Sequence, residues 1–174
     1  MSNYIQKLIE EGEHQMLDFK YEISDCKKIA RSLVAFANTD GGRLLIGVKD
    51  NGDISGLQVT DALMKKISSI RSDGNILPLP MMTTEKITTE QGDVLVVEVT
   101  PSFDTPVRYR GRTFIRVGPR RDIATIEEER ILSERCAASL PTFDTNPCRE
   151  ATIDDLFIDV IVDEYLPKAI DKEV

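Results

Sequence analysis

The stretch from Asp18 to Gly56 constrains the fold most, because it predicts a strand, a helix, a glycine-containing turn and a second strand in direct succession. Apolar residues recur at helical spacing over residues 26–38, which predicts an amphipathic helix with Asp25 as its N-cap. Residues 44–48 form an apolar run, as is typical of a central strand that is buried on both faces. We therefore expect the later strands to add to a sheet that this unit begins.

The link between this helix and this strand, Asn38-Thr39-Asp40-Gly41-Gly42, predicts a tight return of the chain into the sheet. Glycine readily adopts the left-handed backbone that ends many helices, so two glycines in succession favour a C-cap followed by a turn. We expect Asn38 and Thr39 to brace this turn rather than to take part in chemistry, and Cys26 to pack in the core. The residues assigned to shape turns are Asn38, Gly41, Gly42 and Gly47.

Further elements follow from the spacing of apolar residues along the rest of the chain. Residues 16–20 alternate as a half-buried strand that places Asp18 and Lys20 on one side and Leu17 and Phe19 on the other. The remaining expectations are helices over residues 3–11, 60–72 and 126–138, strands over 81–88 and 94–99, and a hairpin over 107–117. The fold class is therefore α+β, with a mixed β-sheet and packed helices, followed by a C-terminal acidic helical tail.

Length and composition predict one globular domain with a tail. With 174 residues, of which 41% are apolar, the chain can bury a core without a metal or a disulfide. We expect a domain over residues 1–140, then a linker and an acidic helix over 141–174 that lead into further domains of a longer protein. Three cysteines without metal-ligand spacing predict reduced thiols in a cytoplasmic protein. No apolar run is long enough to span a membrane, so no membrane partner is expected.

The charge is unevenly distributed along the chain. The formal net charge is −8, but residues 141–174 hold nine acids against three bases, whereas residues 105–121 hold six arginines and no acid. A nearly neutral body with one basic ribbon can bind a polyanion locally. The sequence therefore does not exclude nucleic acid as a partner, despite the overall negative charge.

The arginines of the predicted hairpin are candidates to contact nucleic acid, because a guanidinium group offers planar donors that match phosphate oxygens. Alternation places Arg112 on the same face as Arg116, with Ile115 and Val117 pointing to the core. The neighbouring aromatic residues either stack on bases or lie in the core, and the sequence leaves both readings open. The candidate nucleic-acid-binding residues are Arg108, Arg110, Arg112, Arg116, Arg120, Arg121 and Lys20.

Six segments carry a resemblance to a known family. They are LDFK, AFANTDGGRLLIGV, KDNGDISGL, GDVLVVEV, PVRYRGRTFIRVG and EEERIL. Together, over roughly residues 8–138, they resemble the Schlafen-type AlbA-like DNA-binding domain, a family also called divergent AAA. The resemblance implies an AlbA-like α+β fold, DNA or RNA as a partner, and a place in a transcriptional regulator.

The same resemblance implies a second, enzymatic role. Some vertebrate relatives cleave RNA with three carboxylates, and the matching positions here are Glu13, Asp18 and Asp50. In those enzymes a glutamate stands where this chain has Asp18. Such a cluster would hold Mg²⁺ or Mn²⁺, which activates water for attack on a phosphodiester. The alternative is structural, with Glu13 and Asp50 in turns and Asp18 paired with Lys20 or Lys49.

Three hypotheses about function therefore stay open. The first is a nucleic-acid-binding domain of a transcriptional regulator, and the second is a metal-dependent ribonuclease. The third is a domain for oligomerisation or partner docking, since exposed hairpins and an amphipathic tail favour a homo-oligomer. ATP binding is not expected, because the chain contains neither of the glycine-rich phosphate-binding motifs.

Overall fold

The computed structural model of the chain describes residues 2–72, 74–139, 152, 158 and 162–163. The chain divides into two units, Met1–Leu140 and Pro141–Val174. The linker and acidic helix predicted over 141–174 lie outside the described residues, apart from 152, 158 and 162–163. Helices and strands of the first unit form an α+β fold, as predicted.

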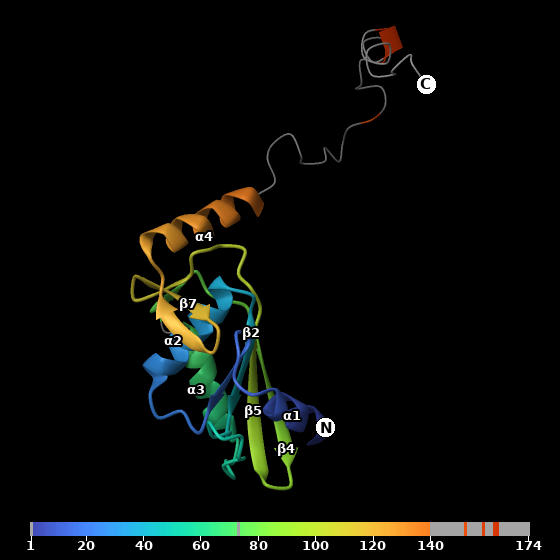
Figure 1. Cartoon of the computed structure of the whole chain (residues 1–174), viewed down its shortest axis with the longest axis vertical. Coiled ribbons are helices and arrows are strands. Elements are labelled where there is room, and N and C mark those ends of the chain that lie inside the picture. The colour runs from blue at the N-terminus through green and yellow to red at the C-terminus, as the bar shows by residue number, and fades with distance from the viewer. Residues whose placement is uncertain (1, 73, 140–151, 153–157, 159–161, 164–174) are drawn as a thin grey trace. The chain divides into compact units, whose positions relative to one another are not determined.

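One sheet of four strands lies at the centre of the first unit (Figure 1). Its order is β1 (Leu17–Lys20), β2 (Gly42–Ile46), β5 (Gly92–Val99) and β4 (Met82–Thr89). The first two strands are parallel and the other pairings are antiparallel, so the prediction of a mixed sheet is confirmed. Because β2 lies between two other strands, both of its faces must be covered.

Helix α1 (Ser2–Glu11) covers one face of this sheet. Ile5 and Leu8 of the helix are buried against Leu17, Phe19 and Leu45, together with apolar residues of β4 and β5. Alternation along a strand directs neighbouring side chains to opposite faces. Leu44 and Ile46 therefore point to the other side, into the larger core.

Helices α2 (Cys26–Asn38) and α3 (Asp61–Ser72) cover the opposite face (Figure 1). The predicted N-cap is present, since the side chain of Asp25 accepts a hydrogen bond of 2.8 Å from the backbone N–H of Lys27. In α3, Ile67 and Ile70 are buried in the same core as α2. Helix α2 is packed between this first sheet and a second sheet.

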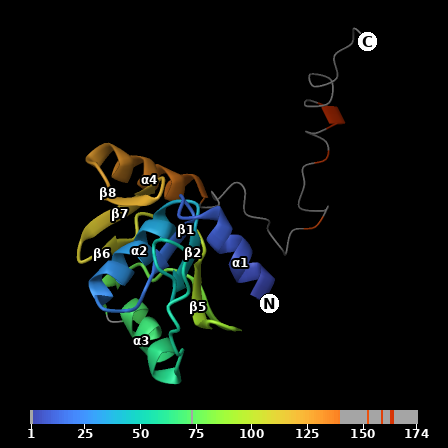
Figure 2. The same ribbon diagram turned by 60° about the horizontal axis from the view of Figure 1, so that its bottom comes forward.

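The second sheet has four antiparallel strands in the order β3 (Ile76–Leu77), β6 (Arg108–Tyr109), β7 (Arg112–Val117) and β8 (Arg120–Ile123). It lies on the side of α2 away from the first sheet, near α4 (Figure 2). The predicted hairpin is confirmed as β6 and β7, whereas β8 was not predicted. The expectation that the later strands add to the sheet of β1 and β2 holds for β4 and β5 but is wrong for the hairpin, because α2 packs between the two sheets. Helix α4 spans Ile126–Ser139.

Asn38, the last residue of α2, joins that helix to the second sheet. Its Oδ1 accepts a hydrogen bond of 2.7 Å from the backbone N–H of Val107, and its Nδ2 donates to the backbone carbonyls of Val107 and Phe114 at 2.8 and 2.9 Å. The side chain is buried. The side chain of Asn38 therefore braces the hairpin, about 70 residues later in the chain, whereas the sequence predicted that it braces the turn.

The turn after α2 depends on glycine. Gly42 has φ +155°, and a Cβ atom there would lie 2.5 Å from two ring carbons of Phe36 and 2.6 Å from the carbonyl oxygen of Met16. Gly41 and Gly47 also have positive φ. Gly42 is the first residue of β2, and a side chain there would meet Phe36 and the backbone of Met16, so this position requires glycine.

Two expectations about burial were wrong. Cys26 is exposed, because it stands at the first position of α2, before the helix meets the sheet. Strand β7 is buried on both faces over Thr113–Arg116, whereas Val117 at its end is 56% exposed. Alternation alone places one face in water, but here α2 covers one side of β7 and Glu129 of α4 contacts the other. In the described part of the chain, no helix has the length and apolar character needed to cross a membrane.

Candidate nucleic-acid interface

The structure divides the predicted arginines into a first group, whose guanidinium groups are already bound within the protein, and a second group that is accessible. Arg116 belongs to the first group, because it is only 4% exposed. Its guanidinium donates to the carbonyl oxygens of His14 at 2.7 Å, Gln15 at 3.2 Å and Leu17 at 3.3 Å, and it lies 4.9 Å from the ring centroid of Phe36. The placement of Arg116 on an open nucleic-acid-binding face is therefore corrected.

Asp18 pairs with two cations, Arg116 and Lys20. Its Oδ1 accepts a hydrogen bond of 2.7 Å from Lys20 Nζ, its Oδ2 accepts one of 3.0 Å from Ser32 Oγ, and Arg116 Nη1 lies 3.7 Å from Oδ2. This pairing matches the structural alternative for Asp18. Lys20 is consequently neutralised by its own strand, which argues against its predicted contact with phosphate. Arg108 is similarly engaged, since its Nη2 lies 3.3 Å from Glu129 Oε2.

Glu13 lies beside Asp18, as the predicted three-carboxylate site requires. Its Oε1 accepts a hydrogen bond of 2.8 Å from the backbone N–H of Phe19. Burial and a hydrogen bond with Asp18 raise the pKa of Glu13. Burial also opposes ionisation of Asp18, but the hydrogen bond from Glu13 and the charges of Lys20 and Arg116 together lower its pKa. Of these two neighbouring carboxyl groups, Glu13 therefore keeps its proton to a higher pH than Asp18 does.

The third predicted carboxylate, Asp50, is exposed in the loop after β2. Among the described residues, no group of three or more acidic, cysteine or histidine side chains is placed to hold a metal ion. The positive charge that Mg²⁺ or Mn²⁺ would bring to Glu13 and Asp18 is already supplied by Lys20 and Arg116. This arrangement does not fit a three-carboxylate metal site, and the nuclease hypothesis stays a prediction for experiment.

The second group of arginines remains accessible. Arg110, Arg112 and Arg120 are exposed, and Arg121 is partly buried with its Nη1 donating at 2.9 Å to the carbonyl of Lys28 and to Ser32 Oγ. Within the described ranges, none of these four arginines forms an ion pair with a carboxylate. Burial lowers the pKa of Arg121, with the repulsion of Arg31 and Arg116 adding to the effect and Asp18 opposing it. Their charge is thus largely uncompensated.

Arg31 of α2 was not among the predicted binding residues, but the structure places it with them. Its guanidinium carbon lies 5.6 Å from the ring centroid of Phe114 on β7, and no residue in the described part of the chain accepts a hydrogen bond from its Nε. The signal in the sequence was Arg31 following Lys27 and Lys28 at helical spacing on the wet face of the helix. We define the basic face as Lys28, Arg31, Arg110, Arg112, Arg120 and Arg121.

A cavity of about 210 Å³ opens within the basic face. Both aromatic residues of the hairpin, Tyr109 and Phe114, belong to the buried core, so the core alternative for them is the correct one. Arginine side chains cover their outer surfaces, with Arg31 over Phe114 and Arg110 over Tyr109. The residues that line the cavity are Arg31, Tyr109, Arg110, Arg112, Phe114 and Ile123.

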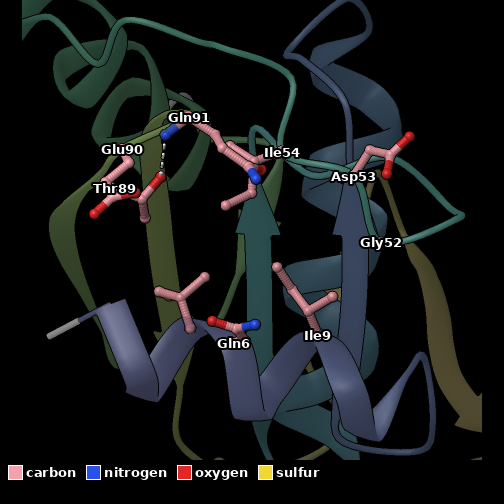
Figure 3. A pocket seen from close by; sticks show the side chains of 9 residues that line it. Gln6, Ile9, Gly52, Asp53, Ile54, Thr89, Glu90 and Gln91 are labelled. Carbon is pink, nitrogen blue, oxygen red and sulfur yellow. Dashed lines mark hydrogen bonds between the residues drawn. The ribbon is translucent and has the colours of Figure 1, made fainter.

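A second cavity has the opposite character. It has a volume of about 290 Å³ and lies between α1, the loop around Gly52 and the β4–β5 turn (Figure 3). Among the described residues that line this cavity are the acids Asp53 and Glu90 and amides such as Gln6, but neither a lysine nor an arginine. A polyanion is repelled by such a lining, which leaves the basic face as the candidate interface.

Comparison with known protein families gives a match to the family described as Schlafen, AlbA_2. The match covers residues 13–125, which is more than half of the chain. It includes every strand, together with α2 and α3. No curated protein sequence matches the chain.

Two solved structures are similar in fold. One is the crystal structure of the DIP2311 protein from Corynebacterium diphtheriae, which is 20% identical with a TM-score of 0.50 over 70% of this chain and 29% of that protein. The other is the solution NMR structure of the N-terminal domain of a RecG-related protein from Nitrosomonas europaea, 24% identical with a TM-score of 0.50 over 71% of this chain and 88% of that domain. This chain thus spans less than a third of the DIP2311 protein.

Proposed function

Because the chain belongs to the Schlafen, AlbA_2 family, we propose that it is a nucleic-acid-binding domain that contacts phosphates through the basic face. Its place would be the DNA-binding part of a transcriptional regulator, as the family resemblance implies. The basic face combines the wet side of α2 with β8 and the β6–β7 turn, all of which lie within or beside the matched residues.

One observation carries this proposal. Four arginines of the basic face, Arg110, Arg112, Arg120 and Arg121, have no carboxylate partner among the described residues, although the chain as a whole has an excess of acids. Arg43 and Arg130, in contrast, are each paired with a carboxylate, Arg43 with Glu98 at 2.8 Å. Unpaired guanidinium groups side by side repel one another, and a polyanion relieves that repulsion.

The way in which β8 is held adds to the proposal. Arg121 fixes the strand to α2 through two hydrogen bonds of 2.9 Å, so that the cations of the strand and those of the helix keep a fixed relative position. A rigid array of donors loses less conformational entropy on binding than flexible side chains do. This arrangement favours a defined phosphate-binding surface over a diffuse cloud of charge.

Fluorescence anisotropy with a labelled DNA duplex, a DNA single strand and the matching RNA tests the proposal. We expect binding that weakens when Arg120 or Arg112 is replaced by glutamine. Arg43→Gln is the matched control, since it removes the same charge from a half-buried arginine that is already paired with Glu98. Equal effects of Arg120→Gln and Arg43→Gln would show that only net charge matters and would contradict a defined binding face.

The same assay separates the alternative functions. Adding Mn²⁺ and following the length of the RNA on a gel detects cleavage, which the nuclease hypothesis predicts and which Asp18→Asn or Asp50→Asn should abolish. Binding without cleavage agrees with the proposed function. Absence of both binding and cleavage, together with a dimeric mass in solution, would favour the oligomerisation hypothesis.

A further inference from the structure

We propose that the cavity between Arg31 and the β6–β7 hairpin takes one unpaired nucleotide of the bound strand, with its phosphate on the arginines and its base against the apolar wall. The inference rests on the proposed function and narrows it, because it makes single-stranded nucleic acid the preferred ligand. Its basis is the composition and rigidity of the lining of this 210 Å³ cavity.

Two of the three lining arginines are held in place before any ligand arrives. Arg31 lies over the ring of Phe114 at 5.6 Å, and Arg110 lies over the ring of Tyr109 at 5.5 Å. Arg110 also donates two hydrogen bonds to Asn75. Its backbone N–H donates to the carbonyl oxygen of Asn75 at 2.8 Å, and its Nε donates to Asn75 Oδ1 at 3.1 Å. The rings belong to the core, so these contacts restrain the two guanidinium groups at the mouth of the cavity.

The polar part of the lining suits an anion. Arg31, Arg110 and Arg112 bring three positive charges to one small cavity, and the described residues that line it include no acid. The buried Nε of Arg31 has no acceptor among the described residues. Guanidinium groups that lie together without a carboxylate favour the oxygen atoms of an anionic ligand. A phosphate group supplies several such oxygens together with negative charge.

The apolar part of the lining suits a flat ring. Ile123 at the end of β8 is 51% exposed and forms one wall, with Tyr109 and Phe114 behind the arginines. A base can pack against such a wall and stack on the plane of a guanidinium group. In a duplex the bases are paired and stacked inside the helix, so only an unpaired nucleotide can place its base here.

The test compares two ligands and three variants. The ligands are a labelled 12-nucleotide single strand and the blunt duplex of the same sequence, each titrated with the whole 174-residue chain in the anisotropy assay. The variants are Ile123→Thr and Arg112→Gln in the cavity, and Arg120→Gln on the basic face outside its lining. Ile123→Thr keeps a β-branched residue in the strand and leaves the charge unchanged, so it isolates the contact with the base.

We expect the wild-type chain to bind the single strand more tightly than the duplex. Ile123→Thr should weaken single-strand binding by about fivefold or more, the effect of losing one base-packing contact, and should leave duplex binding within twofold. Arg112→Gln should lower the preference for the single strand as well, whereas Arg120→Gln should weaken both ligands in the same proportion.

The failures of the two proposals are distinguishable. If the duplex binds as tightly as the single strand, or if Ile123→Thr changes neither, the cavity takes no nucleotide, although the basic face still binds nucleic acid. If neither ligand binds at low salt, both proposals are overturned. Thermal melting followed by circular dichroism verifies that each variant is folded. Little loss of stability is expected, because all three substituted residues are at the surface.

Discussion

Replacing Asp18 by asparagine tests whether the buried charges around β1 hold the first unit together. Asparagine has almost the same shape and keeps an acceptor for Ser32 Oγ, but it removes the negative charge that faces Lys20 and Arg116. The side chain of Arg116 is 1% exposed, so its positive charge would stay in the interior without its main counter-charge. Removing one partner of a buried ion pair costs about 3–5 kcal/mol.

That cost corresponds to a large change in thermal stability. For a folded unit of this size, each kcal/mol lowers Tm by about 3 °C, so a drop of about 10–15 °C is expected. The matched control is Glu98→Gln, which removes the carboxylate from the exposed pair with Arg43. An exposed pair contributes about 0–1 kcal/mol, so this control should melt within about 3 °C of the wild type.

The difference in stability between the wild type and Asp18→Asn should also depend on pH, in a defined direction. The pKa of Asp18 is lowered in the folded state, so the stability that its ionised form contributes is complete above the ordinary pKa of an aspartate and is lost as pH falls through the folded pKa. The gap between wild type and Asp18→Asn should therefore be constant from about pH 7 to pH 5 and shrink below about pH 4. Urea titrations at pH 7 and near pH 3 measure it. A gap no larger than that of Glu98→Gln, or one that does not shrink in acid, would refute the reasoning.

Three further substitutions have defined outcomes. Gly42→Val should cost more than about 2 kcal/mol in urea unfolding, because its Cβ would overlap the ring of Phe36 at φ +155°; a stability like that of the wild type would mean that the turn is placed wrongly. Asn38→Ala should cost about 2–4 kcal/mol, because it leaves the buried N–H of Val107 without an acceptor. Amide hydrogen exchange should then rise selectively in β6 and β7. A uniform rise over the whole unit would argue against a local brace. Glu13→Gln should gain stability relative to the wild type as pH rises from about 4 to 7. The raised pKa of Glu13 makes its ionisation unfavourable in the folded state, whereas glutamine does not ionise. A relative loss of stability over the same range would contradict a raised pKa for Glu13.

Much of the fold is local in origin, and this is why the sequence predicted it. Helix α2 carries its own N-cap in Asp25 and its own stop signal in the following glycines. The strand after it is apolar at every position from Leu44 to Ile46, which only a central strand tolerates. These signals act over a few residues, so no knowledge of the tertiary structure is needed to read them.

The candidate interface was predicted less well, because burial of an arginine depends on what packs over it. Arg112 and Arg116 share one face of β7, yet Arg112 at the start of the strand is exposed while Arg116 lies under the segment from His14 to Leu17. No local pattern shows that a segment 100 residues earlier supplies three carbonyl acceptors. Arg31 was missed for the converse reason, since its neighbour Phe114 comes from a distant strand.

The central claim is that the unpaired arginines of the basic face form the contacts with nucleic acid phosphates. The most direct measurement is the salt dependence of duplex DNA binding by the wild type and by the triple variant Arg110→Gln, Arg112→Gln and Arg120→Gln. Each phosphate contact contributes about 0.9 to the slope of log K against log salt, so the triple variant should lose about 2.7 from that slope. A slope that is near zero in the wild type, or that the three substitutions leave unchanged, would contradict the claim.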